Sequence, residues 1–129
     1  MFLLYKKLTN LKLSILYHNH HDITTAYDSI GYIYFYQCKY NEALAMYQKS
    51  LDIGLLLVGY KHFNVTSSYD NVGTVYSYQG KYDRALCLYQ ISLYIKLSIL
   101  GHNHYTIGKS YHDIGFIYHT INPSIMKQF

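Results

Sequence analysis

The 129-residue sequence lacks tryptophan, contains a single proline and has only 14% charged residues. Lys and Arg exceed Asp and Glu by 11 to 7, so the formal net charge is +4, and the basic residues are scattered along the chain. Nucleic-acid binding needs Lys and Arg clustered on one surface, so a nucleic-acid partner is not expected. No apolar run reaches the roughly 20 residues of a membrane-spanning helix, which argues against a membrane span.

Cysteine is also scarce. Cys38 and Cys87 form no C-x-x-C motif, and nothing in the sequence pairs them. Free thiols in a reducing compartment are the expectation, which favours the cytoplasm. The opening stretch, MFLLYKKLTNLKLSIL, suggests a signal peptide, but Lys6, Lys7 and Lys12 interrupt it and its apolar residues recur at helical spacing. We expect it to form an amphipathic helix instead.

Tyrosine is abundant, with 18 residues, and several of them recur at a fixed interval. Residues 69–93 read YDNVGTVYSYQGKYDRALCLYQISL and closely repeat residues 27–51, YDSIGYIYFYQCKYNEALAMYQKSL. The motif begins a third time at Tyr111, with YHDIGFIYH. The interval from Tyr27 to Tyr69, and from Tyr69 to Tyr111, is 42 residues. A fixed period of this length is typical of a repeat array.

Each repeat contains two segments with helical periodicity. Tyr27, Gly31 and Tyr34 lie on one face of a helix, and Ala43 and Tyr47 form a matching face on the next. Glycine inside a helix costs about 1 kcal/mol relative to alanine, so its recurrence predicts close approach of the paired helices. The positions expected to pack in the three repeats are Tyr27, Gly31, Tyr34, Ala43, Tyr47, Tyr69, Gly73, Tyr76, Ala85, Tyr89, Tyr111, Gly115 and Tyr118.

The array is expected to cover residues 1–121, with an irregular tail at 122–129. Two complete helix pairs are flanked by one half-repeat at each end. In order, the segments are residues 1–17 (second helix of a truncated repeat), 22–58 (repeat), 64–100 (repeat) and 106–121 (first helix of a truncated repeat). Asp22, Asn64 and Thr106 have side chains suited to cap the first helix of each pair.

The pattern Y-x2-I-G-x2-Y, followed by A-x3-Y-x2-S, resembles the tetratricopeptide repeat, with Tyr27 where that family favours Trp and Tyr47 where it favours Phe. The usual repeat has about 34 residues. A longer second helix and a G-x-x-H loop, as from Gly59 to His62, are similar to the kinesin light chain type. HEAT and armadillo repeats lack this Gly and Tyr spacing, and propeller blades would alternate at period two. The resemblance implies an all-α, right-handed superhelical solenoid.

Two groups of polar residues suggest chemistry, but their spacing argues against it. One histidine recurs in successive loops: His20, His62 and His104. Such placement favours loop packing or capping, and a metal site needs three or four converging ligands, so no metal or cofactor is expected. Asp28, Asp70 and His112 occupy one position on successive first helices. Neighbouring helix axes lie about 8–10 Å apart, so these groups would be spread over an open face, and no enzyme activity is expected.

In tetratricopeptide proteins the first helices line a concave groove that binds extended peptides or helices. The resemblance therefore assigns ligand binding to the first-helix residues that point away from the packed face. These residues are Asp28, Tyr32, Phe35, Tyr36, Asp70, Thr74, Ser77, Tyr78, His112, Phe116 and His119. Aromatic side chains outside a core are typical of recognition surfaces.

The charges divide between the two kinds of helix. Acidic residues dominate the first helices and their caps, with Asp22, Asp28, Asp70 and Asp113 against Lys109 alone. Basic residues dominate the second helices, with Lys6, Lys7, Lys12, Lys49, Arg84 and Lys96. We expect a neutral to acidic groove, which favours apolar or basic partner segments, and a basic outer wall.

The expected function is non-catalytic binding of a peptide or helix of a protein partner. Two alternatives remain open. The chain could be a structural spacer of a longer array, or it could contact anionic surfaces through its basic second helices. The half-repeats at the two ends also predict self-association, because apolar helix faces without a partner tend to find another surface.

Overall fold

The computed structural model describes residues 2–59 and 61–122, and the side chains of residues 13, 14 and 16–19 lie outside this description. This part of the chain contains five α-helices and no strand: α1 (Phe2–Tyr36), α2 (Tyr40–Val58), α3 (Phe63–Tyr78), α4 (Tyr82–Leu100) and α5 (Tyr105–Ile121). The chain is therefore an all-α helical array, as predicted. The predicted tail beyond Asn122 lies outside the described residues.

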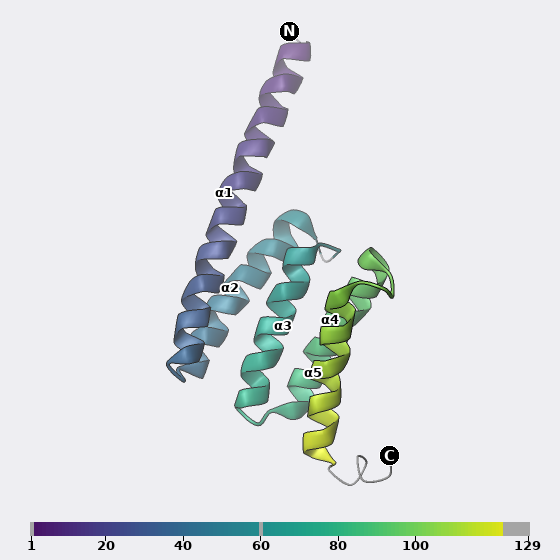
Figure 1. Ribbon diagram of the computed structural model, residues 1–129. Coiled ribbons are helices and arrows are strands. Elements are labelled where there is room, and N and C mark those ends of the chain that lie inside the picture. Colours follow the sequence, from purple (N-terminus) through teal and green to yellow (C-terminus); the bar gives the residue numbers. More distant parts are fainter. Residues whose placement is uncertain (1, 60, 123–129) are drawn as a thin grey trace.

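The helices stack in chain order. α2 packs on α1 and α3, and α4 packs on α3 and α5. Figure 1 shows two layers, with α1, α3 and α5 in front of α2 and α4. The C-terminal half of α1, together with α3 and α5, thus forms the layer of first helices, and α2 and α4 form the layer of second helices.

The predicted break after residue 17 is wrong, because α1 is one continuous helix of 35 residues. The two other inter-repeat loops begin at Gly59 and Gly101, whose φ angles are 77° and 75°. Side chains disfavour this left-handed conformation. Tyr17 stands at the equivalent position of the first loop, so the chain has no glycine on which to turn, and Asp22 lies inside the helix instead of capping one.

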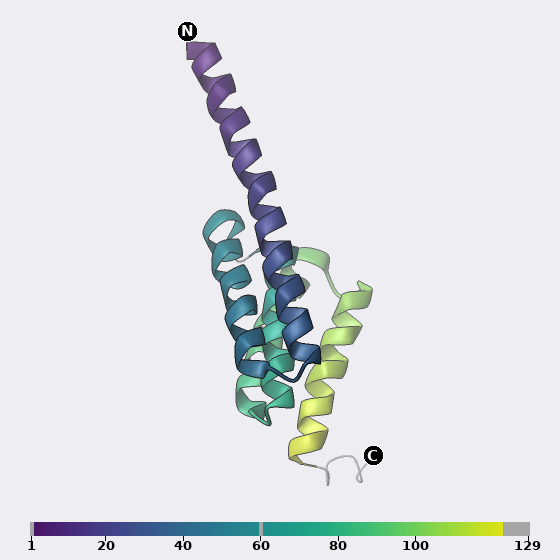
Figure 2. The ribbon, with the colours of Figure 1, turned by 90° about the vertical axis from the view of Figure 1, so that its left-hand side faces the viewer.

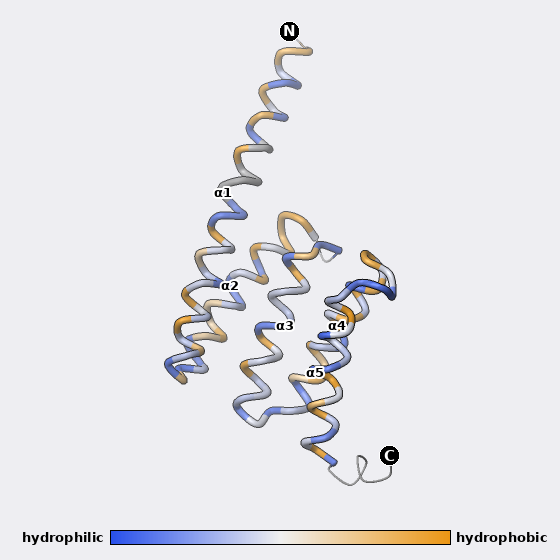
Figure 3. Tube along the Cα trace, viewed as in Figure 1, coloured by the Kyte–Doolittle hydropathy of each residue, from blue (hydrophilic) through white to orange (hydrophobic). Residues whose placement is uncertain are grey.

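As a result, the N-terminal half of α1 does not fold back onto the array. Figures 1 and 2 show it extending beyond all the other helices. Hydrophobic and hydrophilic residues alternate along it (Figure 3). Its exposed apolar side chains are Phe2, Leu3, Leu4, Tyr5, Leu8, Leu11 and Ile15. Among the described residues, no helix is long and apolar enough to cross a membrane.

Histidines cap the two helices that follow inter-repeat loops. His62 is the N-cap of α3 and accepts a hydrogen bond from the backbone N–H of Asn64 at 3.1 Å, and His104 accepts one from Thr106 at 3.3 Å. The predicted caps, Asn64 and Thr106, are therefore wrong, because the imidazole two residues earlier takes that role. The expectation that these histidines serve packing or capping is confirmed at both loops.

The close approach predicted at the repeated glycines is confirmed in the first two repeats. A Cβ atom on Gly31 would lie 2.8 Å from Cε1 of Tyr47, and one on Gly73 would lie 3.1 Å from Cε1 of Tyr89. The tyrosine rings thus lie directly against the backbone of the first helix. Both tyrosines are buried, and the neighbouring Ala43 and Ala85 are buried beside them.

The third repeat is different because its glycine has no ring against it. Nothing lies within 4 Å of a Cβ atom built on Gly115. The flanking Tyr111 and Tyr118 are exposed, whereas Tyr27, Tyr34, Tyr69 and Tyr76 are half-buried. The repeat positions of α5 thus present an open face within the described part of the chain.

The three glycines allow a direct test of the close approach. We expect Gly31→Ala to destabilise the fold, because Tyr47 would have to move, and Gly73→Ala to change stability little. Gly115→Ala should stabilise the helix by about 1 kcal/mol through helix propensity alone. Gly73→Leu should overpack the interface and lower the free energy of unfolding by about 1–3 kcal/mol or more. Urea unfolding measures all four variants. Equal shifts for the three alanine variants would contradict the close-packing explanation.

Candidate functional site

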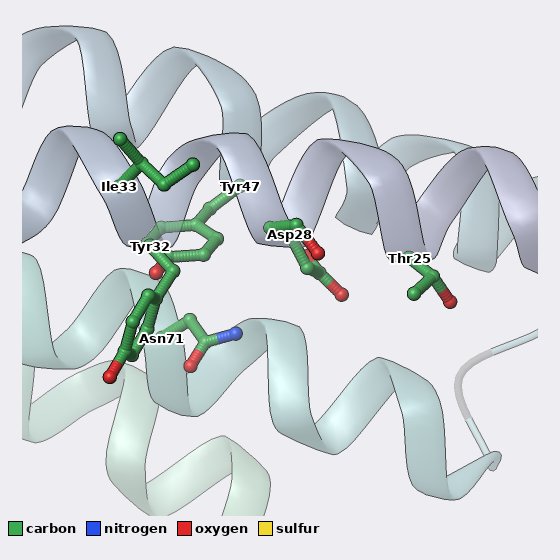
Figure 4. Close-up of a pocket in the computed structure, with 7 residues that line it drawn as sticks. Thr25, Asp28, Tyr32, Ile33, Tyr47 and Asn71 are labelled. Atoms are coloured by element: carbon green, nitrogen blue, oxygen red, sulfur yellow. The ribbon is translucent and has the colours of Figure 1, made fainter.

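A large surface depression lies between α1 and α3. It has a volume of about 510 Å³ and is lined by Thr25, Asp28, Ser29, Tyr32, Ile33, Tyr47 and Asn71. Figure 4 shows Asp28 and Tyr32 projecting from α1, and Asn71 from α3, toward the space between the two helices. The depression is therefore walled by first helices and floored by Tyr47 of α2.

This depression continues across the layer of first helices. The next one shares Tyr32, Tyr47 and Asn71 with it and adds Phe35, Tyr36, Thr74, Val75 and Lys109. Two more lie between α3 and α5, lined by Thr74, Ser77, Tyr78, Tyr82, Tyr89, His112, Asp113, Phe116 and Ile117. Because neighbouring depressions share lining residues, we treat them together as one groove.

Aromatic rings form one end of the groove. Phe35 of α1 meets Tyr78 of α3 edge to face, with ring centroids 4.9 Å apart. Tyr36 contacts Phe35 at 5.4 Å and Tyr32 at 4.5 Å. Tyr32, Tyr36 and Tyr78 are each more than half exposed, as is Phe116 on α5. Rings in these positions can offer large apolar contact area together with polar hydroxyl edges.

The floor of the groove is made by two buried tyrosines. The hydroxyl group of Tyr89 lies 2.8 Å from Oγ1 of Thr74. Burial raises the pKa of both Tyr47 and Tyr89 to about 12. Both phenols are therefore neutral at physiological pH, and they present hydrogen-bonding groups rather than charges to the groove.

The structure brings the predicted groove residues together, with two exceptions. His119 is exposed on α5 but lies outside the residues that line the groove. Asp70 does not reach the open surface, since it is only 8% exposed. Its Oδ2 accepts a hydrogen bond from Nζ of Lys96 at 2.6 Å. The placement of Asp70 in the groove and of Lys96 on the outer wall is therefore corrected, because the two charges pair between the helices.

The polar lining residues that were missing from the predicted groove set include Asn71, Lys109 and Asp113. Lys109 precedes His112 by three positions, so both lie on the same helix face, and helical spacing alone could have found it. Asn71 and Asp113 directly follow predicted positions, which shows that the groove covers a wider face of each helix than the repeat pattern indicated.

The groove is less acidic than the charge pattern predicted. Asp70 is buried, and Lys109 joins Asp28 and Asp113 among the lining residues. Burial raises the pKa of Asp28, with a smaller opposing effect of the Ser50 hydroxyl. Burial also raises the pKa of Asp113, opposed mainly by Lys109. Asp28 is therefore an acidic residue of the groove whose own depression is lined by no basic residue.

Metal chemistry finds no support in the described part of the chain. There, no three His, Cys, Asp or Glu side chains are close enough together to hold a metal ion. Both cysteines are free thiols and exposed.

Comparison with known families decides the class of the chain. A family model described as the tetratricopeptide repeat matches residues 22–98. The chain belongs to the tetratricopeptide-repeat family. The match covers all but the last two residues of the two complete repeats and thus includes the depression between α1 and α3.

A solved structure shows the same fold. BtubC (BKLC) from P. vanneervenii superposes with a TM-score of 0.72 at 18% sequence identity. The match covers 77% of this chain and 39% of that chain. No curated protein sequence matches the chain. The likeness to BtubC shows that the two chains share a fold.

The two equivalent aspartates of the tetratricopeptide repeats should respond in opposite ways to neutralisation. A raised pKa means that the native state holds the Asp28 proton more tightly than the unfolded chain, so ionisation of Asp28 lowers stability as the pH rises through that pKa. Asp28→Asn should therefore raise the free energy of unfolding at pH 7, and the gain should shrink toward acidic pH. Asp70→Asn should lower it by about 3–5 kcal/mol, because Lys96 is left buried without its partner charge. Urea unfolding at several pH values tests both variants, and a loss of stability in Asp28→Asn at pH 7 would contradict the assignment.

Proposed function

We propose that the groove binds an extended peptide or a helix of a protein partner, and that the chain is a non-catalytic interaction module. Membership of the tetratricopeptide-repeat family supports protein–protein interaction or a scaffold role in general. The observation that carries the finer proposal is the exposure of Tyr32, Tyr36, Tyr78 and Phe116 along connected depressions. Clustered exposed aromatic residues with polar neighbours are typical of binding hot spots.

The groove chemistry favours a mixed apolar and polar ligand. Aromatic rings supply apolar contact, and the Asn71 amide and Thr74 hydroxyl can pair with backbone groups of an extended segment. Asp28 and Asp113 stand against Lys109 in this surface. We therefore expect neutral or basic segments to bind better than acidic ones.

The two free cysteines lead us to expect a cytoplasmic location for the chain.

Substitutions of exposed rings test the groove without touching the core. Tyr32→Ala together with Tyr78→Ala should abolish retention of the chain on an array of synthetic peptides, because both rings are more than half exposed and offer contact area to a ligand in the groove. Tyr94→Ala, which removes a still more exposed ring from the outer layer, is the matched control and should bind as the parent chain does.

The same array tests contact through the outer layer. Lys49 and Arg84 are exposed there, and they lie over the rings of Tyr27 and Tyr76. Neutralising them with glutamine should leave peptide retention unchanged. Loss of retention only in that variant would favour the alternative of an anionic partner on the basic outer face.

A second candidate function is structural, in which the chain stacks with other repeats in a longer array, and the open face of α5 favours it. Tyr5 stands at the position of Tyr47 and Tyr89 in the 42-residue register and is 72% exposed. Gly115 stands at the position of Gly31 and Gly73 and has no ring against it. The two ends of the described array thus carry complementary halves of one interface. We propose that a second copy docks its N-terminal helix on α5 and places Tyr5 against Gly115.

Filling the glycine position should block this association. In sedimentation velocity, the parent chain should associate with rising concentration, and Gly115→Leu should stay monomeric because the side chain occupies the place of the Tyr5 ring. Gly108→Leu is the matched control, since nothing lies within 4 Å of a Cβ atom there either. A parent chain that stays monomeric, or a Gly115→Leu variant that associates as strongly as the parent chain, would contradict this docking. A structural spacer without self-association would then remain as the alternative.

A further inference from the structure

The two complete repeats differ at one position between the helix layers. In the second repeat, Lys96 of α4 donates hydrogen bonds to Asp70 Oδ2 at 2.6 Å and to Ser110 Oγ at 3.0 Å. Lys96 is only 4% exposed, so its ammonium group fills the space between α3 and α5. One period earlier, Asp28 corresponds to Asp70, but Gly54 stands in place of Lys96. The first repeat thus has the aspartate, Asp28, but has no lysine at the position that could pair with it.

Asp28 is left without the partner that its equivalent has. Its Oδ1 atom is buried and has no hydrogen-bond partner. The Ser50 hydroxyl, which opposes the effect of burial on the pKa of Asp28, also lies 3.3 Å from the carbonyl oxygen of Thr24, and its single hydrogen serves only one of these two acceptors at a time. Asp70 also has one unpaired oxygen, but its other oxygen carries the ion pair with Lys96. A desolvated carboxylate with no counter-charge is unfavourable, and a cation beside it would relieve the penalty.

The depression beside Asp28 is open to a ligand. It is the 510 Å³ depression between α1 and α3, and the lining residues other than Asp28 are all uncharged. Figure 4 shows the Asp28 carboxylate directed toward the space between these helices, with Thr25 and Asn71 on either side of it. The ring of Tyr32 stands at one end of the same space, where a cation can also contact an aromatic face.

We propose that this depression is a subsite for a Lys or Arg side chain of the bound peptide, with Asp28 as its counter-ion. The proposal rests on the proposed peptide-binding function and specifies one position of the ligand. The bound cation takes the role that Lys96 plays in the next repeat, but it is supplied from outside the chain. The hydroxyl groups of Thr25 and Ser29 and the amide oxygen of Asn71 can accept its remaining hydrogen bonds.

Other occupants fit this position less well. An apolar side chain would leave the carboxylate buried and unpaired, and an acidic side chain would repel it. A metal ion needs several ligands, and no such group of His, Cys, Asp or Glu side chains exists in the described residues. One positively charged side chain would neutralise the Asp28 carboxylate, and the nearby hydroxyl and amide oxygen atoms could accept its other hydrogen bonds.

The experiment uses the full chain and synthetic peptides of ten residues. Four libraries carry Lys, Arg, Gln or Glu at a fixed central position, with the other positions drawn from Leu, Tyr, Ala and Ser. The tightest Lys-centred peptide and its Gln counterpart are then labelled with fluorescein and titrated with the chain. We expect the Gln peptide to bind about tenfold more weakly or worse, which corresponds to loss of one hydrogen-bonded charge pair.

Two variants should remove this preference while the fold persists. Asp28→Asn removes the charge, so the Lys and Gln peptides should bind within about twofold of each other, well below the tenfold difference expected for a charge pair. Gly54→Lys supplies the base from inside, as Lys96 does in the second repeat, and should likewise remove the preference. A Cβ atom at Gly54 would lie 3.3 Å from Cγ2 of Val65, so only a small adjustment is needed. Asp83→Asn, which neutralises an exposed aspartate of α4, is the control and should keep the preference.

The outcomes separate this subsite from the peptide-binding function itself. Equal binding of the Lys and Gln peptides to the parent chain would overturn the subsite while the groove function stands. A preference for Lys that survives Asp28→Asn would also overturn it, because the charge would then act elsewhere. Retention of no peptide from any library would remove the proposed function, and the subsite with it.

Discussion

The rest of the array depends on the contact between a helix glycine and the tyrosine ring of the paired helix. The ring of Tyr47 lies against the backbone at Gly31, and the same ring belongs to a core cluster with Val72 and Val75 of α3. Tyr89 repeats this arrangement with Gly73 and with Ile117 of α5. Each tyrosine therefore joins its own helix pair and the next helix at once. The tyrosine ring is thus a shared contact in the core between successive helices, and stacking buries the apolar faces that neither helix of a pair can bury alone.

The groove is a consequence of the same contact. Once the glycine face of a first helix is directed at its partner, the neighbouring positions, such as Tyr32 and Thr74, face the open side. The buried rings also reach this side, since Tyr89 contacts Thr74 through its hydroxyl group. The ring body thus stabilises the core while its polar edge lines the groove. If the groove binds a peptide as proposed, a change at these tyrosines alters stability and binding together.

The sequence allowed the helix pairs, the close approach and most of the groove to be predicted, because each depends on residues that recur with the period. What it did not reveal depends on differences between repeats or on burial. The helix α1 continues because Tyr17 replaces a turn glycine, which is a local exception to the pattern. Lys96 was assigned to the outer wall because its helix carries other basic residues, but only the packing shows that it turns inward to Asp70. Charge counts locate residues along a chain and do not say which of them pair.

The stacking order also has a consequence for how the chain reaches this structure. The helix pairs with substantial contact are all neighbours in sequence: α1 with α2, α2 with α3, α3 with α4 and α4 with α5. Native contacts therefore close short loops, which lowers the entropy lost before they form and favours rapid folding. Any two adjacent helices can start the process, and the structure can then grow in either direction along the array. Folding of this chain is thus a matter of propagation from neighbour to neighbour, without a long-range contact that must form first.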